Sequence, residues 1–340
     1  MLSQSQYLAM TALPTGFQTG IAQSNQVNKV LRQSSIVSSM IAQFICDFSG
    51  KDALDDGTIA TLEANFVAAM QGVWRTKLLG NMSLFVSPTG SDSNTGLSAS
   101  APFATLQKAW NYIVTQLDLN GFNVTVSVAN GTYQTGMTCN GVILGLGAGN
   151  TVSFVGNTLT PASCLITTSN KVPIQVLSGA SITVSGFSLA ASGTIGGITP
   201  APCIVTGSGG AITINGAMSF GTAASFHMWA QSGGYITVNS SYTITGAASS
   251  LYLAAAGSIQ TGQPGSVATI IGTPTFSGGF AAAQAAGLVA VGANNTMTFS
   301  GTANGPRYSA TSNGIISSGQ STTFFPGSTA GTTATGGQYV

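Results

Sequence analysis

The sequence predicts a mainly β protein, a parallel β-helix (solenoid) preceded by a small α-helical N-terminal region. Three observations carry this prediction. Short segments of alternating apolar and polar residues recur over the last two thirds of the chain, glycines separate them, and charged residues are almost absent there. We expect three segments: a helical region over 1–80, a capping helix and β-helix over 81–310, and a Gly/Thr-rich C-terminal tip over 311–340.

The distribution of charge divides the chain into two chemically different parts. Charged residues make up 4% of the 340 residues, where an ordinary soluble domain has about 25%. All seven acidic residues precede residue 119, and beyond it the only basic side chains are Lys171, Arg307 and the single histidine, His227. The surface of the later part must therefore consist of hydroxyl, amide and backbone groups.

The same composition argues against several classes of function. A net charge of +1 without a basic patch does not suit nucleic-acid binding. No apolar run reaches the length of about 18 residues that a membrane span needs, and residues 1–6 lack the basic start and apolar core of a signal peptide. Four cysteines without a CxxC pair, with one histidine, do not suit a zinc site. We therefore expect no metal or cofactor, and small, buried, reduced thiols.

Two helices are expected in the N-terminal region. Between Gln26 and Phe48, apolar residues follow a heptad-like spacing that only Ser34 interrupts. The seam consists of Val27, Val30, Val37, Ile41, Phe44 and Phe48. This pattern fits a short coiled coil between copies of the chain, and equally an amphipathic helix packed on a second one. The second helix is expected from about residue 58 to 71, with Asp55 and Asp56 at its beginning. Its apolar stripe consists of Ile59, Leu62, Phe66 and Met70.

The pattern changes from residue 83 onward. Residues 83–86 are predicted to form a strand, residues 88–96 a turn-rich loop, and residues 102–113 a helix with a mainly apolar face. Asp92 and Asn94 resemble the beginning of a calcium-binding loop. The twelfth position of that loop would be Phe103 instead of glutamate, so no calcium site is expected and the side chains are assigned to the turn itself.

A strand pattern repeats beyond residue 120. Alternating segments of five residues begin at Val124, Thr151, Ser181, Ala211, Tyr235 and Asn295. From Ile182 to Ile212 is 30 residues, and from Ile212 to Ile236 is 24. Second and third apolar segments, such as 187–189 and 226–229, follow several of these. Two or three strands per period without intervening helices indicate a parallel β-helix of about nine coils. A β-sandwich is the alternative, and it would need antiparallel hairpins at shorter spacing.

Residues around the predicted capping helix resemble a known family. The segment 85–96, followed by 102–109, is similar to the segment that caps the first coil of pectin-lyase-like right-handed β-helices in bacteriophage tailspikes and tail fibres. Segments 15–24, 32–35 and 54–57 resemble the N-terminal regions of phage tail proteins.

The C-terminal segments 325–331 and 334–339 also resemble phage tail proteins. Together the resemblances imply a structural fibre or spike of the virion tail, made in the cytoplasm of the bacterial host. They further imply a homotrimer whose N-terminus docks on a tail adaptor or nozzle protein and which contributes to host attachment.

Catalysis is not expected. Many β-helical tailspikes cleave polysaccharide with two carboxylates, but this chain has none beyond Asp118, and nothing suggests that Asp92 and Asp118 meet. A Ser-His-Asp arrangement would need an aspartate near His227. A polysaccharide-degrading tailspike that uses Asp92 or Asp118 at a trimer interface is one alternative. A β-solenoid surface adhesin is the other, and it would need an export signal.

Aromatic residues of the shaft are the candidates for receptor contact. On a strand, His227 and Trp229 would lie on one side, opposite Phe226 and Met228. An exposed His227–Trp229 pair could stack on host cell-surface polysaccharide, or could be an ordinary surface pair or a trimer contact. The same alternatives hold for Tyr235, Tyr242 and Tyr252.

Overall fold

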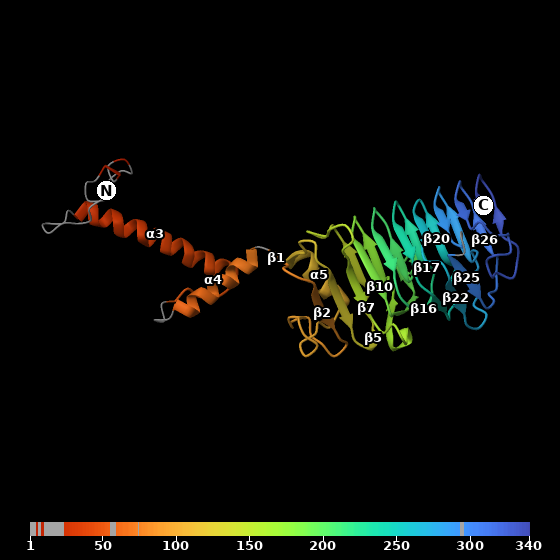
Figure 1. Ribbon diagram of the computed structural model, residues 1–340, viewed down its shortest axis with the longest axis horizontal. Helices are drawn as coiled ribbons and strands as arrows, with labels where there is room; N and C mark the ends of the chain where they lie inside the picture. Colours follow the sequence, from red (N-terminus) through yellow and green to blue (C-terminus); the bar gives the residue numbers. More distant parts are fainter. Residues whose placement is uncertain (1–4, 6–7, 10–23, 55–58, 74, 293–295) are drawn as a thin grey trace. The chain divides into compact units, whose positions relative to one another are not determined.

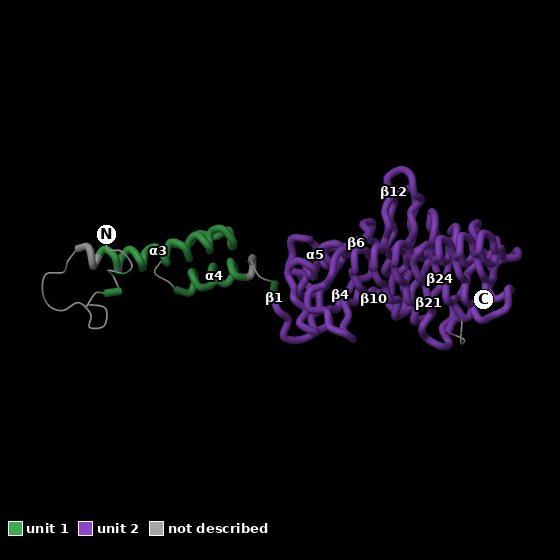
Figure 2. The backbone as a smooth tube through the Cα atoms, turned by 90° about the horizontal axis from the view of Figure 1, so that it is seen from above, with its two compact units in different colours: residues 1–76 green, residues 77–340 purple. Residues whose placement is uncertain are grey.

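The computed structural model describes residues 5, 8–9, 24–54, 59–73, 75–292 and 296–340 (Figure 1). The chain divides into two compact units, residues 1–76 and 77–340 (Figure 2). The division lies close to the position predicted near residue 80. Residues 311–340, expected as a separate tip, belong to the second unit, because their strands extend the sheets of that unit.

The first unit contains two packed helices, α3 (Ser24–Ser49) and α4 (Ile59–Val73). Phe44 of α3 contacts Phe66 of α4 with ring centroids 5.9 Å apart, and Ile45 and Ala69 are fully buried. Of the two alternatives for the apolar seam, packing on a second helix is therefore present within one chain. Asp55, Asp56 and the side chains of Val27 and Val30 lie outside the described residues.

The second unit contains one helix near its N-terminal end, at the position of the predicted capping helix. Helix α5 (Leu106–Gln116) buries Leu106, Ala109, Trp110 and Ile113, and Thr105 caps its N-terminus by accepting a hydrogen bond from the backbone N–H of Lys108. The helix begins later than predicted because Phe103 instead pairs with Val86 in a parallel bridge. Short elements near this end are β1 (Thr76–Lys77) and β3 (Leu117–Asp118).

Three long sheets make up the remainder of the second unit. The ten-stranded sheet contains, in spatial order, β2 (Met82–Val86), β4 (Val124–Val128), β7 (Val152–Val155), β10 (Ser181–Ser185), β15 (Ala211–Ile214), β18 (Tyr235–Val238), β21 (Ser258–Thr261), β24 (Leu288–Ala290), β27 (Ile315–Ser317) and β29 (Gln338–Tyr339). The eight-stranded sheet contains β6 (Met137–Asn140), β9 (Ile174–Leu177), β14 (Ile204–Thr206), β17 (Phe226–Gln231), β20 (Ser250–Ala255), β23 (Ala281–Gln284), β26 (Tyr308–Ala310) and β28 (Thr332–Thr333). The seven-stranded sheet contains β5 (Gly131–Tyr133), β8 (Cys164–Ser169), β11 (Ser188–Ser192), β16 (Met218–Ala223), β19 (Tyr242–Ile244), β22 (Ser266–Ile270) and β25 (Met297–Ser300).

Strand order rises with sequence through each sheet, and the chain visits the three sheets in turn (Figure 1). Neighbouring strands pair in parallel, as β10 does with β15 and β15 with β18. The prediction of a mainly β protein is confirmed, and the topology is compatible with a parallel β-helix. The β-sandwich alternative does not fit, because it needs antiparallel pairing.

The register confirms the spacing of the predicted repeat. Ile182 pairs with Ile212, and Ile212 pairs with Ile236, at the predicted separations of 30 and 24 residues. The segment predicted at 295–299 corresponds to β25, but β25 joins the seven-stranded sheet rather than the ten-stranded one.

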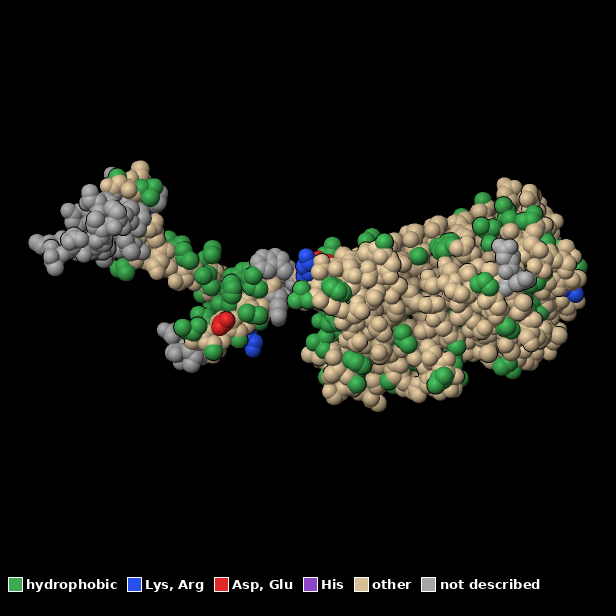
Figure 3. Space-filling model, in the orientation of Figure 1, with side chains coloured by type: hydrophobic (Ala, Val, Ile, Leu, Met, Phe, Trp, Pro, Cys, Tyr) green, Lys and Arg blue, Asp and Glu red, His purple; other side chains and the backbone are tan. Residues whose placement is uncertain are grey.

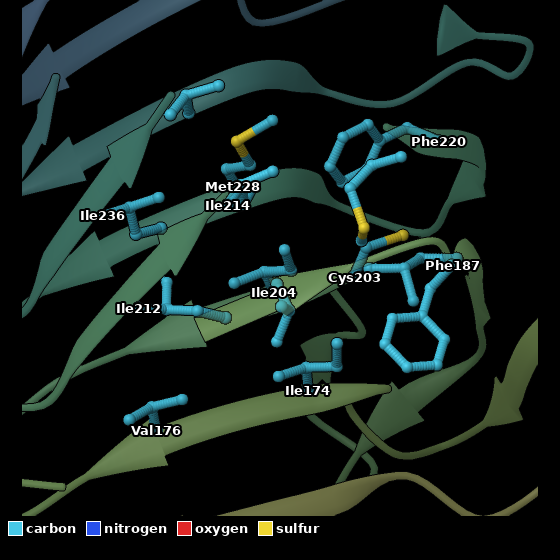
Figure 4. Packing of buried hydrophobic residues seen from close by; sticks show 14 of the residues in the cluster. Ile174, Val176, Phe187, Cys203, Ile204, Ile212, Ile214, Phe220, Met228 and Ile236 are labelled. Atoms are coloured by element: carbon cyan, nitrogen blue, oxygen red, sulfur yellow. The ribbon is translucent and has the colours of Figure 1, made fainter. Parts of the chain in front are cut away.

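Alternate side chains of the strands form one continuous core. Figure 4 shows Ile174, Ile204 and Met228 of the eight-stranded sheet pointing toward Ile212 and Ile236 of the ten-stranded sheet. All five side chains are fully buried. Burial of one such side chain contributes about 1.5–3 kcal/mol, so cohesion of the stack does not depend on charge.

Two further elements interrupt the sheets. The hairpin of β12 (Thr194–Ile195) and β13 (Thr199–Pro200) is antiparallel and projects from the second unit (Figure 2). A 3₁₀ turn, η1 (Pro161–Ser163), precedes β8. Within the part of the chain that the structure describes, no helix combines the length and apolar character needed to cross a bilayer.

Candidate functional site

Three of the five predicted receptor-contact residues are buried. His227 and Tyr252 have no exposed surface and Tyr242 has 2%. The prediction that His227 lies on a surface ledge beside Trp229 is therefore wrong. Strict alternation fails near the start of β17, where His227 and its neighbour Met228 are both in the core, and the ring of His227 packs against Phe276.

The surroundings of His227 keep its imidazole neutral. Its Nε2 lies 2.7 Å from the carbonyl oxygen of Gly221, and rings of Phe220 and Phe276 have centroids 5.6 and 5.8 Å away. Burial lowers the pKa of His227 to about 4, since the charged form would lose its hydration. The neutral ring donates its Nε2 proton to Gly221, which gives His227 a structural role.

Tyr242 and Tyr252 form a second buried polar contact. Tyr242 lies on β19 and Tyr252 on β20, and their hydroxyl groups hydrogen-bond to each other inside the core. Burial raises the pKa of both phenols. The pair satisfies two buried hydroxyl groups and is not available to a receptor.

Trp229 and Tyr235 remain partly exposed on the outer surface. Trp229 makes an edge contact with Phe226, with ring centroids 5.5 Å apart. Its partners in register on the neighbouring strands are Val205 and Leu253, so the outer face of the eight-stranded sheet carries an apolar row here. Trp229 Nε1 has no hydrogen-bond partner among the residues that the structure describes.

Tyr235 borders a shallow groove of about 480 Å³, here called the Tyr235 groove. Its floor is made of small residues from the turns that precede β18, β21 and β24: Gly233, Gly234, Ala256, Gly257, Ala285 and Ala286. Leu288 also lines the groove, which contains no charged side chain. An aromatic ring beside exposed backbone and hydroxyl groups suits a sugar ring, which combines an apolar face with hydroxyl edges.

Stacked turns create the groove. Ser232 and Gly233 have φ values of 47° and 75°, and Gly233 donates a backbone hydrogen bond to Ala256 in the next turn. At Gly234 a Cβ atom would lie 2.5 Å from the backbone of Thr206, so only glycine fits. The sequence patterns did not predict a site at these turn residues. Their signal was the small-residue turn that recurs before each strand of the ten-stranded sheet.

The two acidic residues that precede most of the parallel strands have local partners. Asp92 accepts hydrogen bonds from the backbone N–H groups of Ala104 and Thr105 at 2.9 and 3.0 Å, and from the Thr105 hydroxyl at 2.8 Å. Asp118 accepts one from the backbone N–H of Asn120 at 3.0 Å. Both carboxylates therefore order the chain near α5.

Replacing Asp92 by alanine is expected to lower the free energy of unfolding by about 1–2 kcal/mol, because three donors near the start of α5 lose their acceptor. Asp92→Asn keeps one oxygen for the two backbone donors and should cost less. Urea unfolding of the full chain measures both. Equal stability of the alanine variant and the native protein would contradict this structural role.

The cysteines have the surroundings of buried thiols. Cys139, Cys164 and Cys203 are buried, and no disulfide joins them or Cys46 among the described residues. Burial raises the pKa of Cys164 to about 11 and also raises the pKa values of Cys139 and Cys203. In the described ranges, no three His, Cys, Asp or Glu side chains gather closely enough to hold a metal ion.

Comparisons with family models, with curated proteins and with solved structures found no match for this chain. The function must therefore be argued from the geometry described above and from the surface of the helical unit.

The helical unit exposes apolar side chains that α3 and α4 do not cover for each other. Val37 and Ile41 of the predicted seam are 54% and 37% exposed. Other exposed apolar residues of the two helices are Leu31, Ile36, Met40, Phe48, Ile59, Leu62, Phe66 and Val67. So many exposed apolar side chains on a pair of helices are typical of a protein contact surface.

Proposed function

We propose that this protein is a structural, non-enzymatic component of a bacteriophage tail, a fibre or short spike that contributes to host attachment. Its second unit would be a right-handed parallel β-helical shaft, and its first unit the part that docks on a tail adaptor or nozzle protein. The observation that carries the proposal is the long stack of parallel strands whose outer surface is almost free of charge.

The chemistry of the shaft suits a rigid spacer outside a cell. Each strand hydrogen-bonds to the strands of the coils before and after it, and each coil adds apolar side chains to the same core. The face seen in Figure 3 is largely uncharged polar side chains and backbone, with few charged groups. Such a surface changes little with salt concentration or pH.

The positions of the carboxylates support the proposal that the protein is not an enzyme. After Asp118 the sequence contains no aspartate or glutamate, whereas glycoside hydrolysis normally uses two carboxyl groups. Asp92 and Asp118 are used as hydrogen-bond acceptors near the capping helix. The resemblance of the capping and terminal segments to phage tail proteins supports the same assignment.

A homotrimer would cover the exposed face of α3. Substituting Val37 and Ile41 together by aspartate is expected to convert the trimer into monomers, because six carboxylates would lie in the shared apolar contact. Light scattering measures the change in mass. The matched control substitutes Ser35 and Ser39, which lie on the opposite side of α3, by aspartate and should leave the trimer intact. A native chain that is already monomeric would overturn this assignment.

The Tyr235 groove is the proposed contact for host polysaccharide. Tyr235→Ala should weaken binding to the host's extracted polysaccharide by about tenfold, because the stacking surface is lost. Thr183→Ala, an outward substitution on β10, is the control and should leave binding unchanged. Unchanged binding of the Tyr235 variant would place the receptor contact elsewhere.

The whole assignment is tested by incubating the purified chain with host cells and with their polysaccharide. Cell binding with polysaccharide of unchanged length is the expected result. Binding to nothing would instead indicate a connector that carries another receptor-binding protein. Shortened polysaccharide would overturn the non-enzymatic assignment and direct attention to Asp92 and Asp118.

A further inference from the structure

A second concave site lies on the capping helix, separate from the Tyr235 groove. It is a pocket of about 360 Å³ between one face of α5 and the loop before it. Lys108, Asn111, Tyr112 and Gln116 line it from α5, at the spacing that places side chains on one face of a helix. The volume falls within the range of small-molecule sites.

The pocket contains one cation and no carboxylate. Lys108 Nζ lies 6.0 Å from the centre of the Phe103 ring, a cation–π contact. No aspartate or glutamate of the described ranges forms an ion pair with Lys108. The ammonium group is therefore available to an anionic ligand.

The floor of the pocket is aromatic. Phe103 is buried, and its ring lies 5.8 Å from the ring of Tyr112 between centroids. The Tyr112 hydroxyl makes no hydrogen bond to any residue that the structure describes. Burial raises the pKa of Tyr112, so this hydroxyl keeps its proton and can donate it to a ligand.

Amide groups supply the remaining polar surface. The Oδ1 atom of Asn111 accepts a hydrogen bond from Gln107, which leaves the Asn111 amide protons for a ligand. The Nε2 atom of Gln116 donates to Thr115, which leaves its oxygen as an acceptor. Donors and an acceptor thus surround an aromatic floor, with a cation at one end.

We propose that this pocket binds a carboxylate-bearing sugar, such as a uronic acid unit of a surface polysaccharide. Lys108 would bind the carboxylate, and the partly exposed ring of Tyr112, backed by the buried ring of Phe103, would support the apolar side of the sugar ring. Asn111 and Gln116 would hydrogen-bond to its hydroxyl groups. This inference rests on the proposed role in host attachment. It assigns acidic polysaccharides as the class of ligand that the protein binds.

The experiment is calorimetric titration of the full chain with glucuronate, with glucose and with acetate. We expect binding of glucuronate in the millimolar range, with clearly weaker binding of both other compounds. Lys108→Gln should weaken glucuronate binding by about tenfold, since a charge-assisted hydrogen bond is lost. Lys171→Gln removes an exposed lysine that does not line the pocket and should have no effect.

Several results would overturn the inference. If glucose bound as tightly as glucuronate, the carboxylate would have no role in binding. If acetate bound as tightly as glucuronate, the pocket would bind anions without recognising the sugar. Because Lys108 also packs on Phe103, Asn111→Ala serves as a second variant at an exposed position, and it should weaken glucuronate binding as well. Cell binding is measured separately, so attachment without glucuronate binding would overturn this inference alone.

Discussion

Acidification from pH 7 to pH 4 is expected to lower the free energy of unfolding of the native protein by about 3 kcal/mol more than that of a His227→Gln variant. The pKa of His227 is about 4 in the folded protein, whereas an unfolded histidine has an ordinary value of 6.5. Between pH 6.5 and about 4, His227 is therefore protonated in the unfolded chain but stays neutral in the folded protein.

The sign of this change in stability with pH follows from proton linkage. Stability rises with pH wherever the unfolded state binds more protons, so His227 contributes fully above pH 6.5. That contribution is lost progressively as the pH falls to about 4, where the folded protein also begins to protonate. The cause is the fully buried position of His227, in contact with the rings of Phe220 and Phe276.

Glutamine is the informative substitution because its amide N–H can still donate to the carbonyl of Gly221, while it cannot titrate. Denaturant unfolding of both proteins at several pH values gives the comparison. The carboxylates are common to both, so their titration cancels in the difference. Parallel pH profiles of the two proteins would show that folding leaves the pKa of His227 unchanged and would contradict this prediction.

The repeat could be predicted because a stack of parallel strands imposes its register on the sequence. Ile182, Ile212 and Ile236 stand at equivalent positions in successive coils and are paired directly by the backbone ladder. Most inward positions carry apolar side chains, so the period of the fold appears as a period of hydrophobicity. The boundary between the helical and β units was similarly visible in the change of composition.

The candidate contact residues were harder to predict, for physical reasons. At the beginning of β17 both His227 and its neighbour Met228 are buried in the core. The alternation of inward and outward side chains is broken there, so the sequence pattern could not show which residues are exposed. The Tyr235 groove forms because the stacked turns carry glycine and alanine, as at Gly234. A pattern of apolar and polar residues does not show where such small residues leave a groove. The pocket that Lys108 and its neighbours line on α5 needs the loop before α5 to fold back over the helix, and no local spacing in the sequence predicts that.

Removal of one complete coil is expected to leave a folded protein, because coils contact only their neighbours. Deleting residues 212–235 removes 24 residues (236 − 212 = 24), which is one period of the ladder, since Ile212 pairs with Ile236. Ile236 would then take the place of Ile212 above Ile182. In the other two sheets, β19 would follow β11 and β20 would follow β14.

A shorter deletion should do far more damage. Removing only residues 212–223 takes out half as many residues, but it removes most of β15 and all of β16 while it keeps β17. The short connection that remains cannot pass through the ten-stranded and seven-stranded sheets before the chain reaches β17 in the eight-stranded sheet, so the register of the following strands is lost. We expect the one-coil deletion to keep a cooperative thermal transition and a strand-rich circular dichroism spectrum, and the half-coil deletion to keep neither. The longer deletion would then be tolerated better than the shorter one, and we expect this result only if one coil is the structural unit of the stack. Equal loss of structure in both variants would mean that the stack depends on contacts beyond neighbouring coils.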